Sequence, residues 1–344
     1  MRLDDIMGHD RIKRVLAKIS ADGRVGHAYI FEGMRGVGRM TTAQAFAQLL
    51  VCENPTGGTA CGECRSCRMA ESGSHPDIRI ITNQLYDSDK KSSDILVDTV
   101  RNMKREIYIK PYAAERKIYI VPKADTMNNH AQNSLLKVLE EPPEYCTIIL
   151  IAENSNMFLP TILSRAVILN FEPLEKELVR NYLLQKYPDI TAQDANVKAG
   201  MSQGSIGRAA ELAEDIEADE LRKDVLHAVM NIAYGGRRGL YDAVLFFKRN
   251  KKSVDFIMNV LKSLINDLLY NDGLNRSRTV NTDNLQNIDK LSEKIPPSAA
   301  VCMLETVLKY EDYLDKNLSY PLTMQCMATE LWEAINDRGY RSKI

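Results

Sequence analysis

Four cysteines lie close together in the sequence, at Cys52, Cys61, Cys64 and Cys67. Two overlapping C-x-x-C steps can direct several thiolates at one centre, and four thiolates are the ligand set of a tetrahedral zinc ion. The sequence therefore predicts a zinc site, with a structural role because four protein ligands leave no open position. A redox pair of Cys61 and Cys64 is the alternative. His75 could replace one ligand, although His75-Pro76-Asp77 equally marks the start of a strand.

A glycine-rich turn follows a short apolar stretch and precedes a helical pattern. This is the place of a P-loop, G-x-x-x-x-G-K-[ST], whose backbone amides hold phosphates at a helix N-terminus. The candidate nucleotide-binding positions are Gly33, Gly36, Gly38, Arg39 and Met40. Arg39 stands where the lysine belongs, and the thioether of Met40 cannot replace the hydroxyl that binds Mg²⁺. We expect a degenerate loop without a ligand, with an anion or a nucleotide on its amides as the alternative.

An active P-loop also needs acidic side chains after a neighbouring strand, to organise Mg²⁺ and activate water. The candidate strand, 117–121, is followed by Pro122 and Lys123, which can do neither. Asp125 lies two residues beyond Lys123, and we expect it to cap the segment that follows. The chain is therefore predicted to lack intrinsic ATP hydrolysis, and ATP with Mg²⁺ is not an expected cofactor.

An arginine ends a short helical pattern near residues 158–164, in the run Leu163-Ser164-Arg165-Ala166. A cation at this place could interact with the helix dipole. It could equally project from the domain edge as an arginine finger for a neighbouring subunit's nucleotide. The residues alone leave both interpretations open.

The elements that position these residues follow from the hydrophobic pattern. Strand-like runs alternate with helical patterns as far as Pro173, which predicts βαβ units and a mostly parallel sheet. These runs lie near 28–31, 77–82, 117–121, 146–152 and 166–171. The rest of the chain has helical patterns only. We predict three domains: an α/β domain at 1–173 with the cysteine module 52–67 inserted, a small helical domain at 174–214 and a larger helical domain at 215–344.

Composition limits the class of protein. The 344 residues carry 45 Lys and Arg against 46 Asp and Glu, so the chain is not a polycation for nucleic acid. The longest strongly apolar stretch, 146–152, is much shorter than the ~20 residues that span a bilayer. Acidic residues near the N-terminus occupy the place of an apolar signal segment, so we expect a cytoplasmic protein. The scattered Cys146, Cys302 and Cys326 are expected to be small buried hydrophobic residues.

Together these motifs resemble the clamp loader of bacterial DNA polymerase III, an AAA+ family. The resemblance is dense over about 1–175 and is only architectural beyond about 215. It rests on five features: His27-Ala-Tyr-Ile-Phe31 before the glycine-rich turn, the cysteine module after it, His75-Pro76-Asp77, Asn133-Ser-Leu-Leu-Lys-Val-Leu-Glu-Glu-Pro-Pro143 and Leu163-Ser164-Arg165. It implies an AAA+ α/β domain, a helical lid domain and an all-α collar domain for oligomerisation.

Departures from the active members of that family select the type of subunit. The resemblance implies lysine and a hydroxyl where this chain has Arg39 and Met40, and acids where it has Pro122 and Lys123. It also implies a second sensor arginine at Gly207, and Arg208 is displaced from that position by one residue. Arg165 is retained. The resemblance therefore implies a non-hydrolysing subunit that supplies Arg165 in trans to a neighbouring ATPase within the polymerase holoenzyme.

The implied partners are the gamma/tau and delta subunits of the loader, and through the complex the sliding clamp and primer-template DNA. No membrane partner is expected. An active gamma/tau-type ATPase that uses Arg39 is the enzyme alternative. A zinc-dependent DNA-recognition protein is the binding-module alternative, with Arg65 and Arg68 as its only nearby basic residues.

Overall fold

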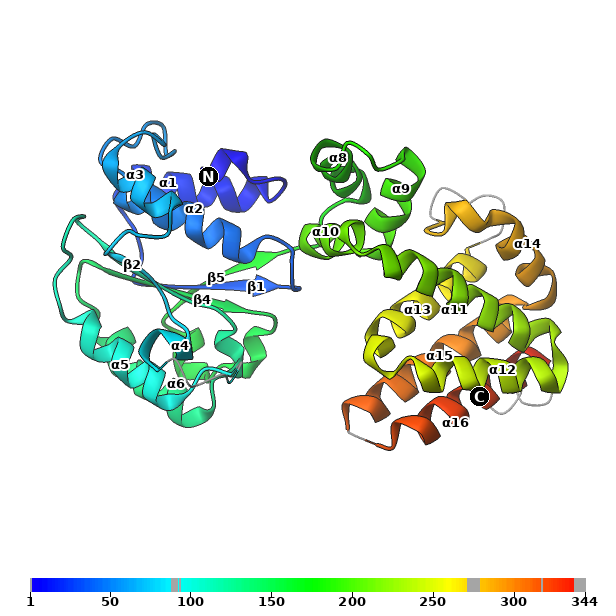
Figure 1. Ribbon diagram of the computed structural model, residues 1–344. Coiled ribbons are helices and arrows are strands. Elements are labelled where there is room, and N and C mark those ends of the chain that lie inside the picture. The colour runs from blue at the N-terminus through cyan, green and yellow to red at the C-terminus, as the bar shows by residue number, and fades with distance from the viewer. Residues whose placement is uncertain (1, 88–91, 93, 271–278, 317, 337–344) are drawn as a thin grey trace. The chain divides into compact units, whose positions relative to one another are not determined.

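The structure is a computed structural model that describes residues 2–87, 92, 94–270, 279–316 and 318–336 (Figure 1). The chain divides into two compact units. The first comprises Met1–Leu178 and Gly204–Gly207, and the second comprises Val179–Gln203 and Arg208–Ile344. Across the described ranges, no helix is both long and apolar enough to cross a membrane.

A five-stranded parallel sheet forms the centre of the first unit, in the order β2-β3-β4-β1-β5. The strands are β1 (Ala28–Gly33), β2 (Ile78–Ile80), β3 (Lys117–Val121), β4 (Cys146–Ala152) and β5 (Val167–Phe171). Every residue of β3 and β4 is buried, as expected for central strands that are covered on both faces. The predicted parallel α/β arrangement is therefore confirmed.

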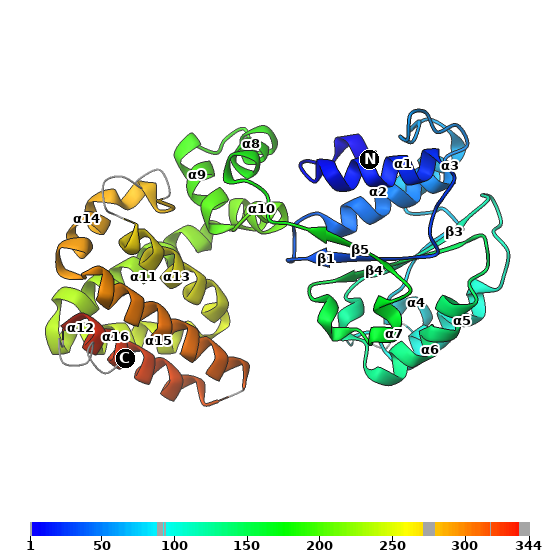
Figure 2. The ribbon, with the colours of Figure 1, turned by 180° about the vertical axis from the view of Figure 1, so that it is seen from behind.

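Helices cover both faces of this sheet (Figures 1 and 2). One face carries α1 (Asp10–Ala21), α2 (Arg39–Val51) and α3 (Arg65–Glu71). The other carries α4 (Asn83–Tyr86), α5 (Val97–Ile107), α6 (Asn129–Glu140) and α7 (Pro160–Leu163). Side chains alternate along β1: Tyr29 packs in the core below α2, whereas Ile30 packs in the core with α6.

One buried carboxylate fixes the turn between α5 and β3. Asp77 is 1% exposed, and its two oxygens accept the backbone N–H groups of Tyr112, Ala113 and Ala114 at 2.7–2.9 Å. His75, just before it, is buried, and its Nδ1 accepts the N–H of Asp77. The expected strand start at His75-Pro76-Asp77 is confirmed, with β2 beginning one residue later at Ile78.

Replacing Asp77 by asparagine should destabilise the first unit by about 1–3 kcal/mol, because an amide cannot accept all three partly buried N–H groups through its single oxygen. Urea unfolding should show a lower midpoint with an unchanged slope. Glu115→Gln, which removes an exposed carboxylate close by, is the matched control and should leave the midpoint unchanged. Equal midpoints for the two variants would contradict this prediction.

The second unit is helical in all its described regular elements. Three short helices come first, α8 (Lys176–Lys186), α9 (Ala192–Met201) and α10 (Ile206–Glu214), although α8 and α10 begin within the first unit. Longer helices follow: α11 (Ile216–Tyr234), α12 (Gly236–Arg249), α13 (Val254–Leu269), α14 (Leu285–Lys294), α15 (Pro297–Asp315) and α16 (Tyr320–Asn336). Short 3-10 helices occur in both units. Those of the first unit are Leu3–Asp5, Ala124–Thr126 and Ser155–Met157, and those of the second unit are Lys251–Ser253 and Thr282–Asn284.

One hydrophobic core joins the long helices and includes Val197 and Met201 of α9. An ion pair between the buried Arg222 and the partly buried Asp283 ties α11 to the segment before α14. Cys302 is buried in this core and Cys146 in the sheet, as predicted, whereas Cys326 is only half-buried. The division into three domains with the boundaries given above stays a prediction.

Candidate functional site

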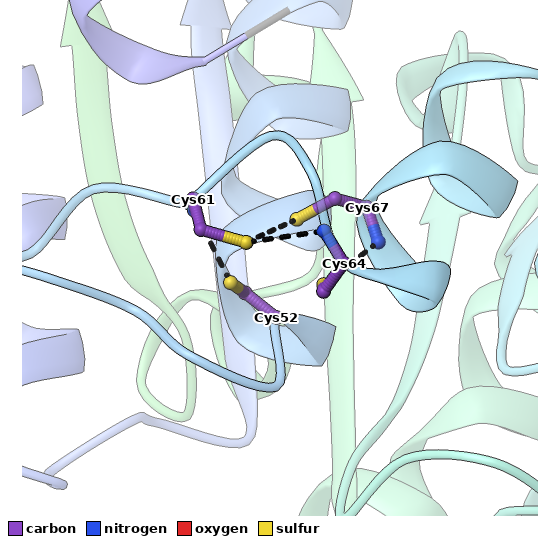
Figure 3. Close-up of side chains that lie close together, drawn as sticks. All are labelled: Cys52, Cys61, Cys64 and Cys67. Carbon is purple, nitrogen blue, oxygen red and sulfur yellow. Dashed lines mark hydrogen bonds between the residues drawn. The ribbon is translucent and has the colours of Figure 1, made fainter.

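The four cysteines converge at one point beside α2 and α3 (Figure 3). Their sulfur atoms all lie within 4.8 Å of one another, and the Cys61 and Cys67 sulfurs are 3.9 Å apart. In a tetrahedron with Zn–S bonds of ~2.3 Å, sulfur atoms are about 3.8 Å apart. The cluster can therefore bind a metal ion with little rearrangement.

Backbone amides organise the cluster from within. The N–H groups of Cys61, Cys64 and Cys67 donate to the sulfurs of Cys52, Cys61 and Cys64 at 3.3–3.4 Å. Cys64 is also the N-cap of α3, a helix that the sequence did not predict. Gly58 and Gly62 have φ values of 80° and 78°, and such turns strongly favour glycine. His75 is not part of this group in the described chain.

The thiols differ in proton affinity. The N–H of Cys64 lowers the pKa of Cys61 to about 6, whereas burial raises the pKa values of Cys52 and Cys67. Cys61 is thus ionised near neutral pH and offers a thiolate to a cation, whose charge would favour the thiolate form of the other ligands.

The glycine-rich turn lies between β1 and α2, as predicted, with Gly38 as the N-cap of α2. Three successive carbonyl groups in it accept hydrogen bonds from outside the turn. Arg35 O accepts from Ser205 Oγ at 2.9 Å, Gly36 O from Gly207 N at 2.8 Å, and Val37 O from His9 Nε2 at 2.8 Å. The conformation of the turn is therefore held by the protein itself.

The contact at Gly207 brings two backbones together. A Cβ atom on Gly207 would lie 2.9 Å from the Cα atom of Gly36, closer than packed atoms normally come. Only glycine fits at this position without a shift of the turn.

Arg39 is turned inward, toward the carboxyl end of β4. Its side chain is 8% exposed, and one terminal nitrogen donates to the backbone oxygen of Ala152. The other lies 3.9 Å from a carboxylate oxygen of Glu153. Burial lowers the pKa of Arg39, while Glu153 and Asp125 favour its charged form. The guanidinium is thus an internal cation at the edge of the sheet.

Two carboxylates at this edge hold a loop. Asp125 accepts the N–H groups of Glu153 at 2.7 Å and Asn154 at 3.4 Å, and Glu32 accepts that of Ser155 at 2.9 Å. The expectation that Asp125 caps the segment after it is wrong, because its carboxylate is used by the loop that follows β4. Lys123 adopts a left-handed conformation with φ 50° and points its exposed side chain away from the core.

Arg165 follows α7 and is 35% exposed. One terminal nitrogen, Nη1, donates to Thr161 O at 2.9 Å and to Ser164 Oγ at 3.3 Å. The other, Nη2, lies 3.2 Å from a carboxylate oxygen of Glu140. The side chain is thus held at the surface of the first unit.

Sequence reasoning missed the residues of α6 that hold this segment. Gln132 is buried; its amide oxygen accepts Leu159 N at 2.8 Å and its nitrogen donates to Met127 O and Met157 O. Glu140 contacts Arg165, as described above. Both lie within or next to the string 133–143 used for the resemblance, but nothing in their spacing indicates these contacts.

Comparisons with known proteins show which proteins this chain resembles in sequence. The family described as DNA polymerase III, delta subunit, matches residues 8–175. The delta-prime subunit of DNA polymerase III from Bacillus subtilis is 27% identical over 94% of this chain and 96% of its own length. The Pseudomonas aeruginosa delta-prime subunit is 35% identical over 41% of this chain and 42% of its own length.

The gamma/tau proteins are also similar, but over a smaller part. The Haemophilus influenzae tau/gamma subunit is 32% identical over 66% of this chain, which spans only 33% of that relative. Similarity that extends along nearly the whole chain is thus found with a delta-prime subunit. By sequence, the chain is therefore grouped with the delta-prime and gamma/tau subunits of bacterial DNA polymerase III.

Proposed function

We propose that this chain is a non-hydrolysing, delta-prime-type subunit of the replicative clamp loader, which helps to load the sliding clamp on primed DNA. The observation that carries the proposal is the burial of Arg39. An active P-loop directs a lysine outward to the β- and γ-phosphates. Here the corresponding side chain bonds to the carboxyl end of β4 and is withdrawn from any ligand on the turn.

The surrounding side chains support the same function. Met40 offers no hard oxygen donor for Mg²⁺, and Pro122 and Lys123 offer neither a metal ligand nor a base. The carboxylates of Glu32 and Asp125 already accept backbone N–H groups. A water molecule near the turn would therefore lack a metal ion, and Glu32 and Asp125 would have to give up bonds to the backbone to act as its base.

The isolated chain should show no Mg²⁺-dependent ATP hydrolysis above background in a phosphate-release assay. Arg39→Lys should not create activity, because the metal ligands remain missing. Turnover by the wild-type chain that disappears in Gly38→Val would contradict the proposal and favour an active gamma/tau-type ATPase. Comparing phosphate release by the isolated chain with release by the chain mixed with its partner subunits distinguishes its own turnover from theirs.

The cysteine cluster supports a structural zinc ion within this subunit. Its four sulfurs match a closed tetrahedral site, and a thiolate set of this kind prefers Zn²⁺ or iron over Mg²⁺ and Ca²⁺. A metal here would stabilise the glycine-rich insert 52–67, which contributes few apolar side chains to a core. A redox pair would leave Cys52 and Cys67 without a role.

Arg165 would act in trans as an arginine finger for a neighbouring gamma/tau-type subunit. Its position at the surface of the first unit, 35% exposed, supports this role. The helical region from 215 onward would form the collar with gamma/tau and delta subunits. Exposed leucines support such a contact surface: Leu308 on α15, Leu322 on α16 and Leu318 between them. Clamp and DNA would be reached through the assembled complex.

A further inference from the structure

The side chain of Glu140 lies against the guanidinium of Arg165. The distance between Glu140 Oε1 and Arg165 Nη2 is 3.2 Å, and the two side chains are 49% and 35% exposed. The remaining contacts of the guanidinium use Nη1, which donates to Thr161 O and Ser164 Oγ. The two ends of the guanidinium fork are therefore held from two different helices, α6 and α7.

The position of Glu140 is unfavourable for α6 itself. Glu140 is the last residue of the helix, next to the backbone carbonyls that carry the negative end of its dipole. A carboxylate there costs helix stability, and Lys137 is the basic residue in the last turn. The stability of α6 therefore does not account for a glutamate at this place, whereas the contact with Arg165 does.

We propose that Glu140 is a positioning residue for Arg165, which orders the guanidinium before a neighbouring subunit docks. This inference rests on the proposed arginine-finger function. An unconstrained arginine loses much rotamer freedom when it becomes fixed, and the loss opposes binding. A side chain that Glu140, Thr161 and Ser164 already hold loses less rotamer freedom on docking. A larger part of its attraction to the phosphate then remains to lower the free energy of the transition state.

The exposure of the pair sets the size of the effect. Exposed ion pairs contribute little, and their measured couplings correspond to at most about a fivefold change. The contact is therefore weak enough for Arg165 Nη2 to leave the carboxylate for a phosphate oxygen, which attracts it more strongly in a closed interface.

The test is ATP hydrolysis by the complete loader, reconstituted with the gamma/tau-type and delta-type subunits of the same organism, with clamp and primed DNA. Glu140→Gln should lower kcat about two- to fivefold with KM for ATP unchanged, and Glu140→Asp should retain part of the activity. Glu141→Gln is the matched control, because Glu141 is the adjacent exposed glutamate. In the Arg165→Ala background, Glu140→Gln should have no further effect.

The outcomes separate this inference from the proposed function. If Arg165→Ala has no effect, both fail. If Arg165→Ala lowers turnover but Glu140→Gln equals wild type, only the positioning role is overturned. An equal loss with Glu141→Gln, a loss that persists without Arg165, or failure of the Glu140→Gln complex to assemble would also overturn it.

Discussion

Replacing Arg165 by alanine should lower the clamp- and DNA-stimulated ATPase at the affected site at least ~10-fold, or ~1.4 kcal/mol of barrier. Phosphoryl transfer accumulates charge on the equatorial oxygens, and a guanidinium from the next subunit neutralises it when the ring is closed. Arg165→Lys should restore little of the ATPase rate, because an ammonium lacks the planar fork that contacts two oxygens. The measurements are ATP turnover and clamp loading per ATP in reconstituted complexes.

Assembly and metal content serve as controls for this prediction, since Arg165 lies far in sequence from the cysteine module and precedes the helical region. Both should be unchanged in the variant. Bulk turnover will fall less than turnover at one site if other interfaces supply their own arginines. Loading and ATPase equal to wild type would leave Arg165 as a surface cation paired with Glu140 and the end of α7.

Protein purified without chelator should contain one equivalent of zinc, and Cys64→Ser should lose it. Serine is a good helix N-cap, so this substitution preserves the cap of α3 while it removes a metal ligand. Residues 52–75 should then become sensitive to protease, because metal binding contributes the folding energy that this insert lacks. The sheet should remain folded. Elemental analysis and limited proteolysis measure the two effects.

Cys326→Ser is the matched control for zinc binding, because Cys326 is a half-buried cysteine in the second unit. It should retain one equivalent. Wild-type protein with well under one equivalent would contradict the zinc site, and one equivalent of iron in its place would change the identity of the metal but not its ligands.

Local sequence was sufficient to predict most of the sheet. The fully buried runs of β3 and β4 are nearly continuous apolar stretches, interrupted only by Lys117 at the start of β3 and Thr147 in β4, whereas a half-exposed strand would alternate apolar and polar residues. The edge strand β5 was predicted within one residue from its strand-like run of residues, 166–171.

The contacts at the sheet edge could not be predicted, because they join residues far apart in the chain. Arg39 and Ala152 are separated by 113 positions, and Asp125 bonds to Glu153 across 28. The residue types suggested that Arg39 does not bind a nucleotide. Only the fold shows that its guanidinium lies at the carboxyl end of β4. Short helices such as α3 are likewise determined by the convergence of the cysteines rather than by hydrophobic periodicity.

The backbone contact between Gly36 and Gly207 limits how this chain could change over evolution. The resemblance to active relatives implies an arginine at position 207, but any Cβ there would come within 2.9 Å of the Cα atom of Gly36. Gly207→Arg thus requires the turn to move, and the turn is held by His9 and Ser205 as well. A gain of ATPase activity would therefore need substitutions at several separate positions, Met40, Pro122 and Lys123 among them, and an arginine at 207 would in addition need a new conformation of the turn.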